Sequence, residues 1–238
     1  MSWPEMAIVS VTVLIGATLQ GSVGFGMGLL ASPILILIDE RFVPAPILLS
    51  TWVLTTFLTL RERHAIDLHG LRWALVGRVV GTFLAGSVLV VLPADRMAVV
   101  FGGLVLVGVL MTASGLRFQP RPRTLATAGM LSAIMGTIAS IGGPPMALVY
   151  QDAEGARLRA TMSSFFWIGT ILSLVALRLV GRFGSEEVRL TLVMLPGTLI
   201  GLYTSRWTAS VVDRGNTRTA VLAVAAVAGV VVILRQLF

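Results

Sequence analysis

Two glycine-rich stretches hold the residue types best suited to chemistry in this sequence. The first covers residues 20–28 (QGSVGFGMG) and the second covers residues 140–145 (SIGGPP). Clustered glycines and prolines interrupt a helix, so each stretch predicts a break in an otherwise apolar helix. Unwound backbone in an apolar environment leaves N–H groups unpaired, and protein, water or a ligand must then satisfy them.

A helix break of this kind suits the binding of an anion. The helix that restarts after it presents free N–H groups and the positive end of its dipole. Glycine lets a ligand approach the backbone closely, and serine adds a hydroxyl donor. The alternative is that the glycines only allow tight helix packing. Because two breaks occur at matching places, we favour one central anion pocket lined by Gln20, Ser22, Gly24, Gly26, Ser140, Gly142 and Gly143.

Two further polar residues are candidates for substrate binding. Arg78 lies six residues beyond Arg72 in an apolar stretch, about 9 Å deeper along a helix. It could offer a fixed charge to an anion, or extend its long side chain back to the polar end of the stretch, and the second alternative is slightly favoured. Gln151 follows the second break and could contact the substrate, although a solvated polar cap is the simpler interpretation.

The elements that must position these residues are membrane-spanning helices. The chain has 238 residues, of which 56% are hydrophobic and only 12% are charged, whereas a soluble domain carries about 25% charged residues. About eight apolar segments lie between short charged clusters, and several reach the ~20 residues that cross a bilayer. The sequence therefore predicts an all-α, polytopic integral membrane protein in the cell inner (plasma) membrane.

Composition excludes several other classes of protein. The net charge of +7 arises from arginines at segment ends, without the basic run that nucleic-acid binding favours. The sequence contains no cysteine and no lysine, so thiolate metal sites and a phosphate-binding Gly-Lys-Ser/Thr loop are absent, and we expect no metal and no cofactor. An intramembrane serine hydrolase is disfavoured, because both histidines lie in one charged connection far from Ser140.

An internal repeat divides the chain. A shift of 116 residues places residues 22–26 over residues 138–142, and residues 81–82 over residues 197–198. A further slip of two residues aligns Asp95-Arg96 with Asp213-Arg214. The connection at residues 117–123 combines two prolines with three arginines and lies at the midpoint. We therefore expect two homologous halves, residues 1–118 and 119–238, within one integral transmembrane domain.

The relation between the halves depends on the first break. A straight helix over residues 6–38 would be about 50 Å long, well beyond a ~30 Å hydrocarbon core. If this stretch is a hairpin that returns to its own side, the halves are inverted about an axis in the membrane plane; if it crosses once, they are parallel. The distribution of arginines does not decide between the two. It does predict that residues 61–72 and 117–123 lie on the same, cytoplasmic side.

Two pairs of glycines match motifs for close helix contact. Gly77-x-x-x-Gly81 and Gly197-x-x-x-Gly201 each place two small residues on one helix face. Small residues let two helix backbones approach closely inside a membrane. We expect these four glycines to act in helix packing.

The two breaks give the chain its resemblance to a known family. Residues 24–28 followed by Pro33, and residues 140–145, are similar to the two glycine-rich signatures of the sulfite exporter TauE/SafE family. The resemblance implies a secondary transporter, typically an exporter, of sulfite, sulfoacetate or related sulfonates. A membrane binding or assembly protein without transport is the alternative. The partners expected are a small anionic substrate and the lipid bilayer, with a homo-oligomer left open and nucleic acid excluded.

Overall fold

Helices make up nearly all of the structure. The computed structural model describes residues 3–93, 96–212, 223, 225–232 and 234, and this part of the chain contains no strand. Asp95, Asp213 and Arg214 of the internal repeat lie outside the described residues. The helices are α1 (Trp3–Val23), α2 (Met27–Ile38), η1 (Glu40–Phe42), α3 (Ala45–Glu62), η2 (Arg63–Ala65), α4 (Leu68–Val91), α5 (Met97–Ala113), α6 (Pro122–Ala139), α7 (Gly143–Tyr150), α8 (Gly155–Leu179) and α9 (Ser185–Val212).

The long helices have the length and apolarity of membrane spans. Five stretches meet both criteria among the described residues: Trp3–Val23, Glu40–Ala65, Leu68–Val91, Gly155–Leu179 and Ser185–Thr208. The apolar helices α2 and α5 are shorter. Large apolar side chains face outward, with Phe83 74% exposed and Leu179 82% exposed, as a lipid-facing surface requires. The expected all-helical fold is therefore confirmed, with fewer full-length spans than the number of apolar segments in the sequence.

Local sequence signals set several helix ends. Asp67 caps α4, where its Oδ1 accepts a hydrogen bond of 3.1 Å from the Gly70 N–H. Pro122 opens α6, a position at which its missing N–H would have no helical partner in any case. These two signals set the starts of α4 and α6, which follow the connections at residues 61–72 and 117–123.

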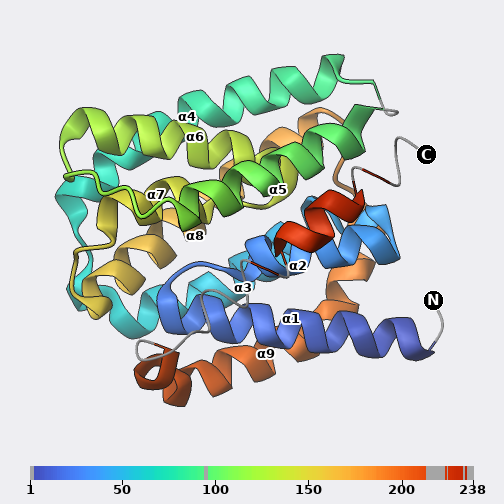
Figure 1. Ribbon diagram of the computed structural model, residues 1–238, viewed down its shortest axis with the longest axis horizontal. Coiled ribbons are helices and arrows are strands. Elements are labelled where there is room, and N and C mark those ends of the chain that lie inside the picture. The colour runs from blue at the N-terminus through green and yellow to red at the C-terminus, as the bar shows by residue number, and fades with distance from the viewer. Residues whose placement is uncertain (1–2, 94–95, 213–222, 224, 233, 235–238) are drawn as a thin grey trace.

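Both glycine-rich stretches break a helix as expected. At the first, Gly24 and Gly26 adopt positive φ angles of 97° and 131°, and α2 then runs back beside α1 (Figure 1). At the second, Ser140 adopts a φ of 62°, and α7 returns beside α6. Residues with side chains rarely adopt positive φ, so glycine suits the first break and Ser140 is an exception. Each break is the tip of a helix hairpin.

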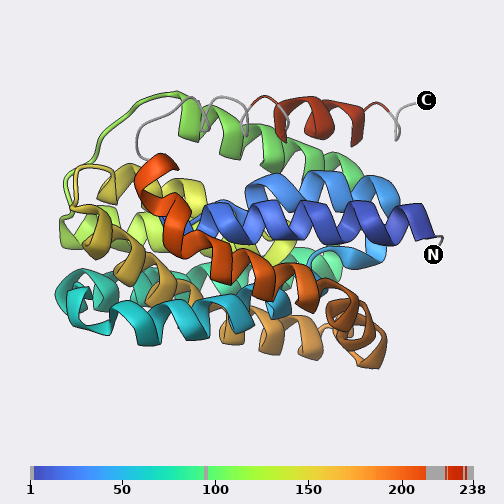
Figure 2. The ribbon, with the colours of Figure 1, turned by 90° about the horizontal axis from the view of Figure 1, so that it is seen from below.

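Long-range packing joins helices from the two parts of the chain. Helix α1 lies along α9 and α3 packs against α8 (Figure 2), and α4 lies along α6 (Figure 1). Glycines of the two small-residue motifs lie at these contacts: a side chain at Gly77 would overlap the Ala126 carbonyl on α6, and one at Gly201 would overlap the Leu14 carbonyl on α1. The predicted packing role of the motifs is confirmed.

The connections at residues 61–72 and 117–123 lie at the same end of the bundle. The hydroxyl of Tyr150 donates to Asp67 Oδ2 at 3.1 Å, which ties the end of α7 to the start of α4. The Phe118 N–H donates to the Leu148 carbonyl at 3.1 Å, so the second connection also lies on α7. That this end faces the cytoplasm stays a prediction.

Candidate substrate-binding site

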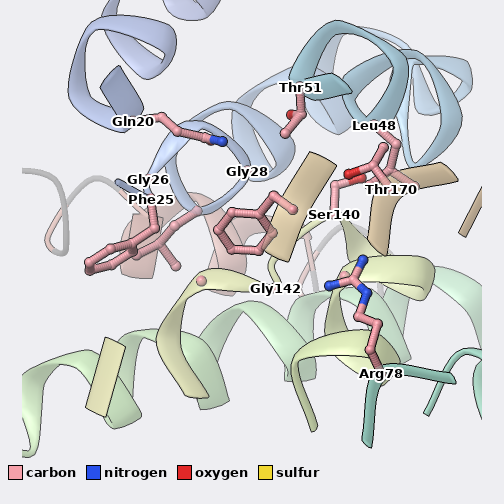
Figure 3. Close-up of a pocket in the computed structure, with 14 residues that line it drawn as sticks. Gln20, Phe25, Gly26, Gly28, Leu48, Thr51, Arg78, Ser140, Gly142 and Thr170 are labelled. Atoms are coloured by element: carbon pink, nitrogen blue, oxygen red, sulfur yellow. The ribbon is translucent and has the colours of Figure 1, made fainter. Parts of the chain in front are cut away.

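The two helix breaks face one another across a narrow cavity (Figure 3). The cavity has a volume of about 20 Å³ in this conformation, which is room for about one water molecule. Its lining residues come from seven helices and the breaks between them, and are Gln20, Phe25, Gly26, Gly28, Leu29, Leu48, Thr51, Arg78, Gly136, Ser140, Gly142, Gly143, Phe166 and Thr170. The structure thus brings together six of the candidate residues from the sequence: Gln20, Gly26, Arg78, Ser140, Gly142 and Gly143.

The breaks touch each other through residues without side chains. A Cβ atom at Gly28, in the first turn of α2, would overlap the carbonyl oxygen of Ser140 in the second break. A Cβ atom at Gly143, at the start of α7, would lie 2.7 Å from a ring carbon of Phe25 in the first break. Each hairpin tip therefore rests on the other, and a larger residue at either position would separate them.

Gln20 supplies a donor to the cavity from the last turns of α1. Its Oε1 accepts a hydrogen bond of 3.3 Å from the Met27 N–H, which ties the end of α1 to the start of α2. The Nε2 of the same amide is buried and has no hydrogen-bond partner. A buried amide donor without a partner is costly unless a ligand or water accepts from it.

The start of α2 and the start of α7 differ in the donors that they offer. The N–H groups in the first turn of a helix have no helical partners. At the start of α2, Gly28 and Leu29 each have such an N–H group. Helix α7 begins with Gly143, Pro144 and Pro145, and the two prolines have no N–H to give. The dipole of both helices points its positive end at the cavity, but α2 carries more of the donors.

Ser140 lines the cavity without offering its hydroxyl hydrogen to it. Its Oγ donates to the Pro44 carbonyl at 3.0 Å, and the side chain is buried. The residue holds the left-handed conformation at the end of α6 and links the second break to the start of α3. In this structure Ser140 holds the break in place. Its hydroxyl hydrogen is already donated, so its oxygen can only accept further hydrogen bonds.

Arg78 is the buried cation of the site. It is 1% exposed, so its side chain does not extend to the membrane surface, and the slightly favoured alternative from the sequence was wrong. Nη1 donates to Ser132 Oγ at 3.4 Å and Nη2 donates to Ser173 Oγ at 3.2 Å, while Nε has no partner. The guanidinium carbon lies 5.0 Å from the centroid of the Phe165 ring. These contacts solvate the charge internally but do not neutralise it.

Small residues on neighbouring helices make room for this guanidinium. A Cβ atom at Gly169 on α8 would overlap the guanidinium, and one at Gly136 on α6 would lie 3.7 Å from Nη2. Ser132 links the guanidinium to the second break, because its hydroxyl accepts from Arg78 Nη1 and donates to the Gly142 carbonyl. The charge of α4 is thereby coupled to the start of α7.

Three candidate residues from the sequence lie away from the cavity. Ser22 donates to the Thr18 carbonyl at 2.7 Å and shares a hydrogen bond of 2.8 Å with Thr208 on α9, so its hydroxyl serves the contact between α1 and α9. Gly24 faces α8, where an added Cβ would lie 3.1 Å from the Cα atom of Arg159. Gln151 follows α7 at the polar end of the bundle, where its amide donates to the Leu116 carbonyl.

An ion-pair cluster of Arg61, Glu62 and Arg159 holds the end of α1 near these helices. Arg159 Nε lies 3.1 Å from Glu62 Oε1, and Arg61 Nη2 lies 3.3 Å from the same oxygen. Arg61 Nη2 also donates to the Gly21 carbonyl at 3.3 Å. The cluster joins α1, α3 and α8 close to Gly24, at the polar end of the first break.

Several residues of the site gave no signal in the sequence. Ser132 and Ser173 hold the guanidinium, and Gly169 gives it space, but each lies in an unremarkable apolar stretch. Thr51, Phe166 and Thr170 line the cavity from α3 and α8. The spacing of four residues between Gly169 and Ser173 places both on one face of α8. The sequence does not show that this face packs against Arg78.

A lipid-facing helical bundle with two hairpin tips around a buried cation belongs to the class of polytopic membrane transport proteins. The chain belongs to the Sulfite exporter TauE/SafE family, whose sequence profile matches residues 8–232. The resemblance inferred from the two glycine-rich stretches is confirmed by this match, which covers nearly the whole chain. No curated protein and no solved structure matches the sequence.

Proposed function

We propose that this chain is a secondary transporter that exports small sulfur oxyanions, such as sulfite, sulfoacetate or related sulfonates, across the cell inner (plasma) membrane. Membership of a sulfite exporter family supports transport as the activity. Two lining residues support an anion as the cargo, because the buried atoms that lack a partner in Gln20 and Arg78 are both hydrogen-bond donors.

The observation that carries this proposal is the state of Arg78. A charged side chain inside a membrane is costly and is retained where it has a function. Among the described residues, no carboxylate pairs with Arg78, and its partners are the neutral hydroxyls of Ser132 and Ser173. The guanidinium therefore brings to the cavity a positive charge that no carboxylate among the described residues neutralises, which suits an anion that is bound and released.

We also propose that residues 1–118 and 119–238 form an inverted repeat. Two features support this arrangement: each half begins with a helix hairpin, and each first helix packs on a long helix of the other half, α1 on α9 and α6 on α4. Positive φ angles occur at Gly24 and Ser140, which the shift of 116 residues aligns. Alternating exposure of the cavity then requires the hairpins to move against the packed long helices.

The proposal is tested by flux through the purified protein in proteoliposomes loaded with radiolabelled sulfite. We expect saturable efflux from the wild type, and a fall of at least about tenfold in Arg78→Gln, since the variant loses the charge that compensates the anion. Arg72→Gln is the matched control, because Arg72 lies on the same helix but is exposed. Normal efflux by a well-folded Arg78→Gln variant would place the binding site elsewhere.

A further inference from the structure

Charge is distributed very unevenly around the cavity. Among the described residues that line it, Arg78 alone is charged, and the remaining polar groups are hydroxyls, backbone and the amide of Gln20. The two hydroxyls that accept from the guanidinium are themselves neutral, and Ser173 passes its interaction to Thr137 at 2.8 Å. The walls therefore present one unit of positive charge.

We infer that the site selects anions with a single negative charge. This inference rests on the proposed transport function and names the charge state of the cargo. A monoanion beside Arg78 leaves the loaded cavity neutral, whereas a dianion leaves one negative charge uncompensated in a region from which water is largely excluded. Hydrogen sulfite and simple alkanesulfonates meet the requirement. The sulfite dianion, sulfate and ionised sulfoacetate carry one charge too many, so the inference narrows the cargo proposed above to the monoanions and removes sulfoacetate from it.

Neutral donors orient the anion without changing this charge balance. Gln20 Nε2 on α1 is buried and unpartnered, and the side chains of Gln20 and Arg78 approach the cavity from different walls (Figure 3). The N–H groups at the start of α2 add donors with only a partial charge. An oxyanion can accept several such hydrogen bonds through its oxygens, but none of them offsets a second full charge.

A matched pair of sulfonates tests the inference directly. Isethionate and sulfoacetate have the same carbon skeleton and differ in whether a hydroxymethyl group or a carboxylate is opposite the sulfonate. At neutral pH we expect proteoliposomes with the wild-type chain to carry isethionate faster than sulfoacetate by on the order of 100-fold, because the second charge lies uncompensated in a low-dielectric site. Equal rates would overturn selection by charge while leaving anion transport intact.

Sulfite provides the second measurement, because it changes charge near neutral pH. At constant total sulfite, the protein-dependent flux should rise as the pH falls and follow the concentration of hydrogen sulfite, after subtraction of the flux through protein-free vesicles. Isethionate keeps one charge over this range, so its flux reports any titration of the protein itself. Flux that follows the sulfite dianion would overturn the inference. Absence of flux for sulfite and both sulfonates would instead overturn the proposed function.

A second cation in the cavity should relax the selection. Gln20→Arg adds a charge at a lining position and should lower the ratio of isethionate to sulfoacetate flux by at least about tenfold, since the loaded site can then neutralise a dianion. Thr127→Arg adds the same charge on the exposed face of α6 and should leave the ratio unchanged. An equal change of the ratio in both variants would assign the selectivity to surface charge and overturn the inference.

Discussion

The two helix breaks share a backbone shape but present different chemistry. Gly24 and Ser140 both hold positive φ angles, and the residues that follow start a short helix whose N-terminus lies at the cavity. The first break offers amide donors from the start of α2, whereas the prolines at the start of α7 remove donors from the second. The second break instead contacts a full positive charge, because Ser132 links the Gly142 carbonyl to Arg78. Two breaks of similar backbone shape thus present two different kinds of donor to the cavity.

The shift of 116 residues sharpens this difference. It places Met194 of α9 at the position of Arg78 of α4. Met194 is fully buried, and its sulfur accepts a hydrogen bond from Ser50 at 3.8 Å. The two positions that this shift aligns therefore differ, since one holds a cation and the other an apolar side chain, and only Arg78 gives the cavity its charge.

The largest effect is expected where the two breaks touch. Gly28→Val should abolish the folded protein, because even a Cβ at this position overlaps the Ser140 carbonyl, and such backbone overlap costs several kcal/mol, above ~3 kcal/mol. The yield of monodisperse protein in detergent measures the outcome. Gly103→Val on α5 is the control, since no atom lies within 4 Å of a Cβ there. A well-folded Gly28→Val variant would mean that the hairpin tips need not meet.

The next effect separates function from stability at the buried charge. Arg78→Met copies the residue found at position 194 and should abolish sulfite flux. Its free energy of unfolding should be unchanged or higher by up to about 4 kcal/mol, because a methionine of similar length removes a buried charge without leaving a polar group behind. Thermal unfolding in detergent checks this. Destabilisation of several kcal/mol together with normal flux would make Arg78 a structural residue.

Substitution of one glycine in each break should separate two reasons for glycine: a positive φ angle at Gly26 and a lack of room for a side chain at Gly142. Gly26→Ala places a side chain at a φ of 131° and should lower the free energy of unfolding, with an expected cost of about 1–3 kcal/mol. Gly142 has an ordinary φ, and its added Cβ would lie 3.0 Å from Ser132 Oγ, so Gly142→Ala should disturb the contact to Arg78. We expect Gly142→Ala to lose more flux and less stability than Gly26→Ala, as measured by efflux and thermal unfolding. The reverse order would contradict the assignment.

The smallest effect concerns the polar end of the bundle, away from both breaks. Partial burial opposes ionisation of Asp67, but hydrogen bonds from the Gly70 N–H, Arg157 and Tyr150 together hold the pKa of this carboxyl below its usual value. A lowered pKa in the folded state stabilises the protein above the unfolded pKa of about 3.9, and the stabilisation is lost as the pH falls through the folded pKa. Asp67→Asn should therefore lower the melting temperature slightly at neutral pH. The difference should vanish in acid, and one that persists there would exclude the charge as its cause.

The positions of the breaks could be predicted from sequence, because glycine and proline act on the backbone locally. Residues 20–28 and 140–145 end helices by their own conformational preferences, whatever packs around them. Pro144 and Pro145 lack an N–H group, so the smaller number of donors at the second break also follows from the sequence. The family assignment followed from the same residues and is confirmed.

The burial of Arg78 could not be predicted, because it depends on residues from other helices. Only the packing of α4 against α6 and α8 brings Ser132, Ser173 and the space at Gly169 to one point. Ser22 illustrates the converse. Its place beside the first break suggested a ligand, but the direction of its side chain from α1 was set by the contact with Thr208 on α9. In both cases the role of the residue depends on a partner that is far away in the sequence.

The pairing of α1 with α9 and of α6 with α4 interlocks the two halves of the chain. Helix α1 is synthesised well before α9, so the glycine-lined contact between them can form only after α9 has been made. A chain severed in the connection at residues 117–123 would give two fragments, each deprived of the surface on which its own hairpin rests. Neither fragment should fold alone, whereas both made in the same cell should reassemble, which would make the two parts of the chain obligate complements of one another.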